Sequence, residues 1–393
     1  MTDAIVLDVL LIVLLIAYVV YGFRNGLSRS VFVIARVVAG AIAAFFVVPL
    51  LTSWVAWSWA RPVVTVAATV FLVVAGHALG STVGRGIRRG IERTPLSGLD
   101  RVLGAVVTGV AAALVASVVG STVSQLGVPV LSRATAGSAV LRTINALTPD
   151  PVEAWVAQLK SIVADSGLPV ISDALGGGTP VIPEIDTGSA QLNTAAQSVV
   201  RITGNAFACG VSQSGTGFVV ADDRVVTNAH VVAGVTEPVV ESPGGEVIAG
   251  TIVYFDPVLD LAIIAVDGLD AGPLPLSDTV SQGTDAAVQG YPYGGPFTSG
   301  AARVLQVGTA QVDDIYGNSA QPREVYTLAA DVRQGNSGGP LLTLDGAVIG
   351  VVFARSADTA NVGFAMTMTE LDPVAGQASA LTTTVSSGEC ISE

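Results

Sequence analysis

Three short motifs in the second half of the chain carry a histidine, an aspartate and a serine that together could perform nucleophilic catalysis. His230 stands in TNAHVV, Asp260 in DPVLDLA and Ser337 in QGNSGGPL. A serine hydroxyl is a weak nucleophile near pH 7 until a neighbouring base accepts its proton, and an acidic side chain orients that base. We therefore expect Ser337 to attack, His230 to act as the base and Asp260 to orient it.

The order of these residues along the chain excludes one alternative arrangement. Residues Gly335 to Gly339 fit the Gly-x-Ser-x-Gly elbow, but the elbow needs a histidine after the serine, and none follows Ser337. The order His, Asp, Ser is instead that of chymotrypsin-like enzymes. The glycines around Ser337 permit a tight turn, and we expect Gly335, Asn336 and Ser337 to form an oxyanion hole there.

The partner of His230 could be either of two nearby acids. Asp256 precedes Pro257, which is typical of a turn, whereas Asp260 opens an apolar strand, where a buried orienting acid belongs. We favour Asp260. The other histidine of the chain, His77, lies in an apolar run and does not compete for the role of base.

The expected substrate pocket involves Asp331, which precedes Ser337 by six residues, and the later strand that contains Phe353 and Arg355. An acid at that offset lies at the base of the S1 pocket in trypsin-like enzymes and selects basic side chains. Arg355 could neutralise Asp331, and Asp331 could equally be a structural carboxylate, so the specificity stays open.

The elements that must position these residues are short strands separated by Gly and Asp turns. Strands are expected at 217–220, 224–227, 246–249, 261–266 and 347–353. Such spacing indicates an all-β barrel or sandwich. Residues 191–393 are long enough for two small barrels.

The first 123 residues have a different character. They hold nine arginines and four acids, whereas the remainder holds nine basic and 27 acidic residues, in a chain that is 51% hydrophobic and only 12% charged. Soluble domains are about 25% charged. The asymmetry ties the basic part to a membrane, and the acidic part is a poor nucleic-acid binder.

Four apolar runs, at 4–22, 31–52, 63–83 and 102–123, are each near the length that crosses a bilayer. The first and third loops between them are richer in arginine than the second, so the positive-inside rule places those loops in the cytoplasm. Both ends of the four-span domain, and the catalytic half with them, would then lie outside the cytoplasm.

Residues 124–190 read as a linker rich in Pro, Gly and Asp with an amphipathic helix near 152–163. The linker is a candidate for self-cleavage.

Cys209 and Cys390 both fall in the external half, where an oxidising compartment favours a disulfide over two free thiols. We expect no metal and no cofactor, because no His/Cys cluster has metal spacing and no phosphate-binding loop occurs.

The motifs around 214–218, 227–232, 260–262 and 335–341 resemble those of chymotrypsin-fold serine proteases of the bacterial high-temperature-requirement type. The four-span block resembles the colicin V production family. The combination is similar to the mycobacterial acid-resistance membrane serine proteases, and this resemblance implies the roles given above to the histidine, aspartate and serine.

We therefore expect four transmembrane helices followed by a two-barrel protease domain, acting as an endopeptidase on cell-envelope proteins in envelope or acid stress. Its partners would be protein substrates and the lipid bilayer, and its oligomeric state stays open. The alternative is a channel or scaffold with a catalytically silent β module.

Overall fold

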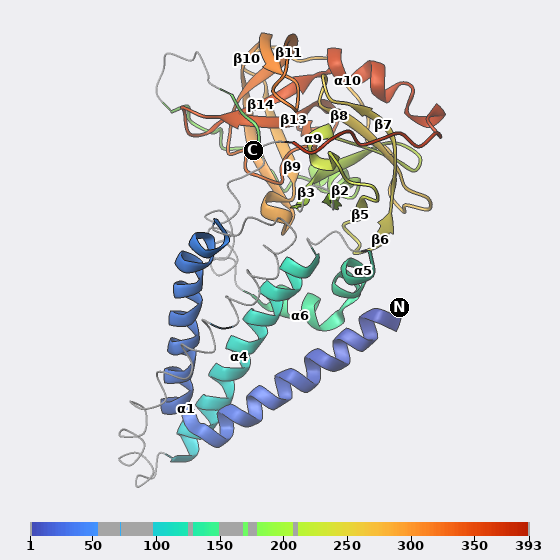
Figure 1. The fold of residues 1–393 in the computed structure, drawn as a ribbon. Coiled ribbons are helices and arrows are strands. Elements are labelled where there is room, and N and C mark those ends of the chain that lie inside the picture. Colours follow the sequence, from blue (N-terminus) through green and yellow to red (C-terminus); the bar gives the residue numbers. More distant parts are fainter. Residues whose placement is uncertain are drawn as a thin grey trace.

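The computed structural model describes residues 2–53, 71, 97–124, 129–148, 168–171, 179–206 and 211–391. Apolar helices occupy the N-terminal part, and a β-domain follows them (Figure 1). The third apolar run (63–83), apart from residue 71, and the amphipathic helix expected at 152–163 lie outside the described residues.

Helix α1 (Thr2–Ser53) consists of two helical segments that meet at Gly26. Gly26 has φ 75°, a left-handed value that glycine adopts without a steric penalty, and a Cβ there would collide with Asp100 of α4 (Ser97–Ser124). Gly22 and Gly104 also touch backbone to backbone, so small residues allow the close crossing of α1 and α4. The loop expected between the first two runs is therefore reduced to a kink.

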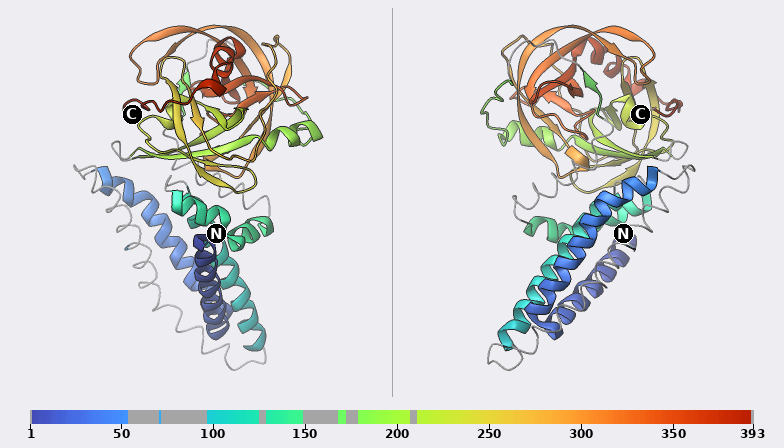
Figure 2. Two further views of the ribbon diagram at one scale, coloured as in Figure 1. Left: turned by 90° about the vertical axis from the view of Figure 1, so that its right-hand side faces the viewer. Right: turned by 60° about the vertical axis from the view of Figure 1, so that its left-hand side comes forward.

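Both halves of α1 and helix α4 extend away from the β-domain, and the kink in α1 lies at the remote end (Figures 1 and 2). Two candidate membrane spans are found among the described residues, Ala4–Leu27 and Gly98–Ser117. They fall on the first and fourth expected runs. The second run lies in the second half of α1.

Two short helices, α5 (Pro129–Gly137) and α6 (Ala139–Leu147), occupy a segment that was expected to be linker. Asp8 of α1 caps α6, because its carboxylate accepts hydrogen bonds from the N–H groups of Ala139 (3.1 Å) and Val140 (3.2 Å). A carboxylate at a helix N-terminus satisfies amides that have no partner inside the helix. The start of the helical region is thus tied to the chain that follows α4.

The first sheet of the β-domain has the strand order β6-β5-β2-β3-β4-β8-β7. The first strand of its long central hairpin, Val199–Ala206, is buried along most of its length. The strands are β2 (Val199–Ala206), β3 (Val211–Ala221), β4 (Arg224–Thr227), β5 (Val239–Glu241), β6 (Val247–Ala249), β7 (Thr251–Asp256) and β8 (Leu261–Ala265).

The second sheet has the order β1-β13-β12-β9-β10-β11-β14, and β13 also pairs with β14, so the sheet closes into a barrel. Its strands are β1 (Val170–Ile171), β9 (Asp285–Gly290), β10 (Thr298–Asp313), β11 (Ala320–Ala330), β12 (Pro340–Leu342), β13 (Val348–Ser356) and β14 (Val362–Thr367). The β-rich expectation is confirmed. The first sheet is curled, and within the described residues no strand pairing joins its edges β6 and β7.

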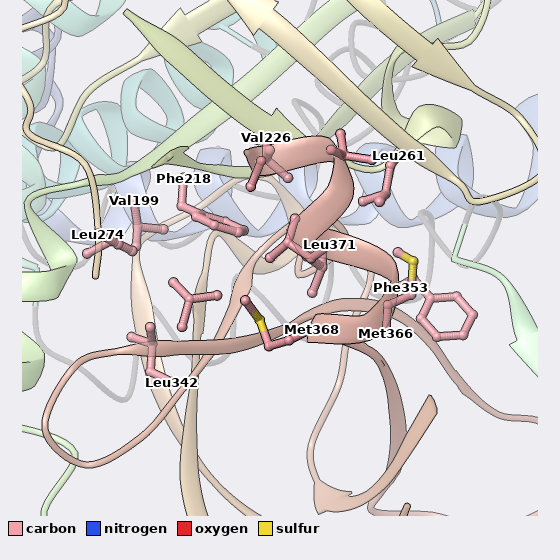
Figure 3. Packing of buried hydrophobic residues seen from close by; sticks show 14 of the residues in the cluster. Val199, Phe218, Val226, Leu261, Leu274, Leu342, Phe353, Met366, Met368 and Leu371 are labelled. Atoms are coloured by element: carbon pink, nitrogen blue, oxygen red, sulfur yellow. The ribbon is translucent and has the colours of Figure 1, made fainter. Parts of the chain in front are cut away.

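The main core lies between the two sheets and is completed by helix α10 (Met368–Ala375). Figure 3 shows Phe218 and Val226 from the first sheet facing Leu371 of α10, with Met366 of the second sheet next to Phe353. Burial of such side chains is worth roughly 1.5–3 kcal/mol each. Four further short helices lie in the β-domain, namely α8 (Ala190–Ala196), α9 (Ala229–Val232) and the 3₁₀ turns η1 (Pro292–Gly294) and η2 (Ala378–Ala380).

Candidate active site

His230 and Asp260 are brought together between β4 and β8 of the first sheet. His230 lies in the single turn α9 directly after β4, and Asp260 lies in the turn before β8 with φ 56°. The Nδ1 atom of His230 is 2.8 Å from Oδ2 and 3.0 Å from Oδ1 of Asp260. The backbone N–H of His230 also donates to Oδ1 at 2.9 Å. The carboxylate therefore fixes both the ring and the main chain of the histidine.

Asp256, the alternative acid, has a different role, because its carboxylate stabilises a turn. Its Oδ1 accepts the N–H groups of Val258 (2.8 Å) and Leu259 (2.9 Å) and so closes the turn after β7. Its Oδ2 accepts the hydroxyl of Tyr254 at 3.2 Å. Burial and the Asp256 charge raise the pKa of Tyr254 to about 12, so this hydroxyl stays a donor. Asp256 is engaged in the turn, and Asp260 contacts the histidine.

Ser337 lies in a buried turn between β11 and β12, and the residue is 3% exposed. Gly335 (φ 92°) and Gly338 (φ 81°) flank it in left-handed conformations. A Cβ at Gly335 would lie 2.8 Å from the N atom of Tyr293, and one at Gly338 would collide with Thr216. The glycine-rich sequence is therefore required both by backbone conformation and by close approach.

The Nε2 atom of His230 is buried and has no hydrogen-bond partner among the described residues. The bond between this atom and the hydroxyl of Ser337 is thus not formed in this conformation. In free enzymes such bonds are often long or misaligned and tighten when substrate binds. His230 itself is 7% exposed, so its ring is largely shielded from water.

Arg323 of β11 is a buried residue near this site that no sequence pattern singles out. Its Nη1 donates to the carbonyl of Leu259 (3.0 Å), directly before Asp260, and its Nη2 donates to the carbonyl of Asp313 (3.0 Å). The guanidinium also lies 5.5 Å from the ring centre of Phe353. Burial lowers the pKa of Arg323, and the charge of Asp260 acts in the opposite direction. The second sheet thereby supports the loop that carries Asp260.

The residues expected to form the substrate pocket have different roles in the structure. Asp331 forms an ion pair with Arg333, with 2.6 Å between Oδ2 and Nη2, and both side chains are about half exposed. Arg333 thus neutralises Asp331, in the role that the sequence suggests for Arg355. Phe353 is buried in the core at 1% exposure. The N–H of Arg355 donates to the carbonyl of Pro169 beside β1.

Cys390 is described and Cys209 is not, so their pairing stays a prediction. No free cysteine occurs within the described part of the chain. Across the same residues, no group of three or more His, Cys, Asp or Glu side chains is arranged to hold a metal ion.

Comparison with known proteins finds matches to two protein families in this chain. Residues 7–149 match the colicin V production protein family, and residues 215–351 match the trypsin-like peptidase domain family. These two ranges coincide with the helical region and with most of the β-domain.

Similar proteins are serine proteases. Serine protease Rv3671c of Mycobacterium tuberculosis strain H37Rv is 36% identical over 409 residues that cover 100% of both chains. A probable periplasmic serine endoprotease, DegP-like, of Halomonas elongata is 34% identical over 175 residues, which are 42% of this chain and 34% of that protein. The crystal structure of the active form of the Rv3671c protease has a TM-score of 0.52 and 38% identity, covering 57% of this chain and 100% of that one.

These similarities set aside the alternative of a catalytically silent binding module. The protein is a serine protease and belongs to the family, exemplified by Rv3671c, in which a colicin V production domain precedes a trypsin-like peptidase domain.

Proposed function

We propose that Ser337, His230 and Asp260 form the catalytic triad of this protease. The observation that carries the proposal is the paired contact of the Asp260 carboxylate with Nδ1 and with the backbone N–H of His230. This contact sets the tautomer in which Nε2 is free to accept a proton. Ser337 would attack the peptide carbonyl and pass its proton to Nε2, which would give that proton to the amine that leaves as the C–N bond breaks. Water would then attack the acyl-enzyme, losing a proton to Nε2, and the freed Ser337 oxygen would take that proton back as the new carboxyl end departs.

The oxyanion hole is proposed to consist of the N–H groups of Gly335 and Ser337. In the hydrogen bonding of the described residues, neither group donates to a protein acceptor. Asn336 was included in the expected set, but its N–H donates to the carbonyl of Arg333 at 2.9 Å. Two preorganised donors of this kind stabilise the negative charge that develops on the carbonyl oxygen.

The proposed substrates are proteins of the cell envelope, and the proposed setting is envelope or acid stress. Asp331 forms an ion pair with Arg333. This pairing supports a pocket in which the Asp331 charge does not select basic side chains. Peptide-library cleavage by the full chain in detergent should therefore show no strong enrichment of Lys or Arg at P1. Strong enrichment would contradict this view of the pocket, and absence of any cleavage above a Ser337→Ala blank would contradict the proposed triad.

Four membrane spans with the protease on the extracytoplasmic side are the proposed topology. The kink of α1 and the start of α4 contact each other at the end remote from the β-domain, which suits a cytoplasmic position for the arginine-bearing turns. A phosphatase reporter fused after Val130 should be active, and one inserted at Gly90 should be inactive. The reverse pattern would contradict this topology.

The linker is also proposed to be cut by the protease itself. Strand β1, which belongs to the linker, pairs in parallel with β13 at Arg355 and Ser356. The same strand β13 exchanges hydrogen bonds with the Ser337 turn, because the N–H of Val352 donates to the carbonyl of Gly339 at 2.9 Å. The linker thus comes close to the catalytic turn.

Cys209 and Cys390 are proposed to form a disulfide. The C-terminal tail lies along the first sheet, since Gly234 donates to the carbonyl of Ser387 (3.0 Å) and Val385 donates to that of Ile252 (2.9 Å). The bond would close a loop of about 180 residues, worth roughly 5 kcal/mol in the chain-entropy model. Thiol alkylation and intact mass should find no reactive thiol in protein taken from the envelope. Two alkylated cysteines would contradict the bond.

A further inference from the structure

The turn that carries Ser337 is anchored through consecutive carbonyl groups. The carbonyl of Gln334 accepts the N–H of Tyr293 at 2.6 Å, and the carbonyl of Asn336 accepts the N–H of Gly339 at 2.9 Å. The C=O and N–H of a planar trans peptide point in opposite directions. These two anchors therefore point the N–H groups of Gly335 and Ser337 to the other side of the turn. These two N–H groups are the proposed oxyanion donors.

Thr216 of β3 holds the two remaining carbonyls of the same turn. Its hydroxyl donates to the carbonyl of Gly335 at 2.6 Å, and its backbone N–H donates to the carbonyl of Ser337 at 2.8 Å. The peptides on both sides of Gly335 are thus fixed. The backbone bond from Thr216 survives any substitution except proline, so only the hydroxyl bond depends on the side chain.

The hydroxyl of Thr216 also joins the turn to a loop of the second sheet. It accepts the N–H of Tyr291 at 2.9 Å, and this amide can only donate. The single hydroxyl proton is therefore committed to the carbonyl of Gly335. Thr216 is completely buried, and a Cβ at Gly290 would lie 2.7 Å from its Oγ1 atom, so the bridge is tightly enclosed.

We propose that the Thr216 hydroxyl is a positioning residue that sets the direction of the Gly335 N–H in the oxyanion hole. The inference rests on the proposed role of Ser337 as nucleophile. Thr216 touches no reacting atom, and it acts through the Tyr291–Tyr293 segment that anchors the peptide before Gly335.

Loss of the hydroxyl leaves two buried groups, the carbonyl of Gly335 and the N–H of Tyr291, without a partner. Unpaired buried polar groups cost free energy. The Tyr291 N–H begins the segment whose Tyr293 N–H holds the carbonyl of Gln334 at 2.6 Å, so a shift of this segment toward another acceptor would release the Gln334–Gly335 peptide. Gly335 has no Cβ to resist rotation of that peptide. The rotation would turn the Gly335 N–H away from the developing oxyanion, which lowers the rate of the chemical step and leaves substrate binding largely intact.

The test compares Thr216→Val with Thr216→Ser in the full chain in detergent, with Thr203→Val as a control for a buried threonine of the same sheet. The readouts are kcat and KM on fluorescent casein and the rate of labelling of Ser337 by a fluorophosphonate. Removal of one oxyanion donor lowers kcat by about 10²–10³-fold. We therefore expect Thr216→Val to lower kcat and the labelling rate by about 10–100-fold. KM should change by less than about twofold, and Thr216→Ser and Thr203→Val should remain near wild type.

Wild-type rates in Thr216→Val would overturn the inference, as would equal losses in the Val and Ser variants. If Thr216→Val does not fold, Thr216→Cys takes its place, because a thiol is only a weak donor. A drop of about tenfold is then expected, and full activity would overturn the inference. Absence of Ser337 labelling in the wild type would instead refute the proposed triad, so the two failures are distinguishable.

Discussion

Ser337→Ala is expected to lower kcat on casein by about 10⁶-fold while the β-domain keeps its melting temperature. The alanine removes only the hydroxyl, and the turn remains anchored through backbone groups such as the Ser337 carbonyl, which accepts the N–H of Thr216 at 2.8 Å. A residual rate above that in water should persist, because the oxyanion donors remain. The variant should also stay at full length if the linker is cut by the enzyme itself.

The matched control for this prediction is Ser281→Ala, which removes an exposed hydroxyl from the same domain. It should retain wild-type turnover and melting temperature. Casein cleavage by Ser337→Ala at more than a few per cent of the wild-type rate would rule out this serine as the nucleophile.

Asp260→Asn is expected to lower kcat by about 10⁴-fold. The carboxylate accepts from both Nδ1 and the backbone N–H of His230, and an amide has only one oxygen to offer. If that oxygen keeps the backbone bond, the amide NH₂ faces the ring and selects the tautomer whose Nε2 carries the proton. That tautomer cannot act as a base. Steady-state kinetics on casein check the effect.

Asp256→Asn is the matched control, since it makes the same chemical change four residues earlier. Its amide oxygen can still accept the N–H groups of Val258 and Leu259, so the turn after β7 is retained. We expect near wild-type turnover and a loss of stability of about 1 kcal/mol or less. If this variant is the more damaged of the two, the orienting acid has been assigned to the wrong residue.

Residue order and local chemistry predicted the features that depend on neighbours in sequence. The order of His230, Asp260 and Ser337 identified the class of enzyme, and a proline after Asp256 indicated its turn. The strands around 217–220, 224–227 and 261–266 were predicted because they alternate or continue apolar residues between turn signals, and they lie in β3, β4 and β8.

Contacts between distant segments could not be predicted in this way. Thr216 lies in a recognisable motif, yet its bonds to Gly335 and Tyr291 depend on how the two sheets meet. Arg323 supports the loop before Asp260 from a strand more than 60 residues away. The sequence offers Arg355 as the partner of Asp331 through the expected pocket wall, whereas the structure pairs Asp331 with Arg333, two residues away.

In the helical region, hydropathy located apolar runs but did not define how they connect. The arginines near residues 24–29 suggested a loop, whereas Gly26 alone makes the kink, because a glycine at positive φ lets α1 approach α4 closely. The Pro-, Gly- and Asp-rich stretches of residues 124–190 indicate a linker, whereas helices α5 and α6, each nine residues long, begin it. Helices of that length are marginal alone and depend on contacts such as the cap from Asp8.

Covalent labelling of the full chain by a fluorophosphonate probe, read by peptide mass spectrometry, tests the proposed triad most directly. The account predicts a single adduct on Ser337 in the wild type and almost none in His230→Ala, because the hydroxyl then has no base to accept its proton. An adduct on another serine, or undiminished labelling of Ser337 without His230, would contradict it.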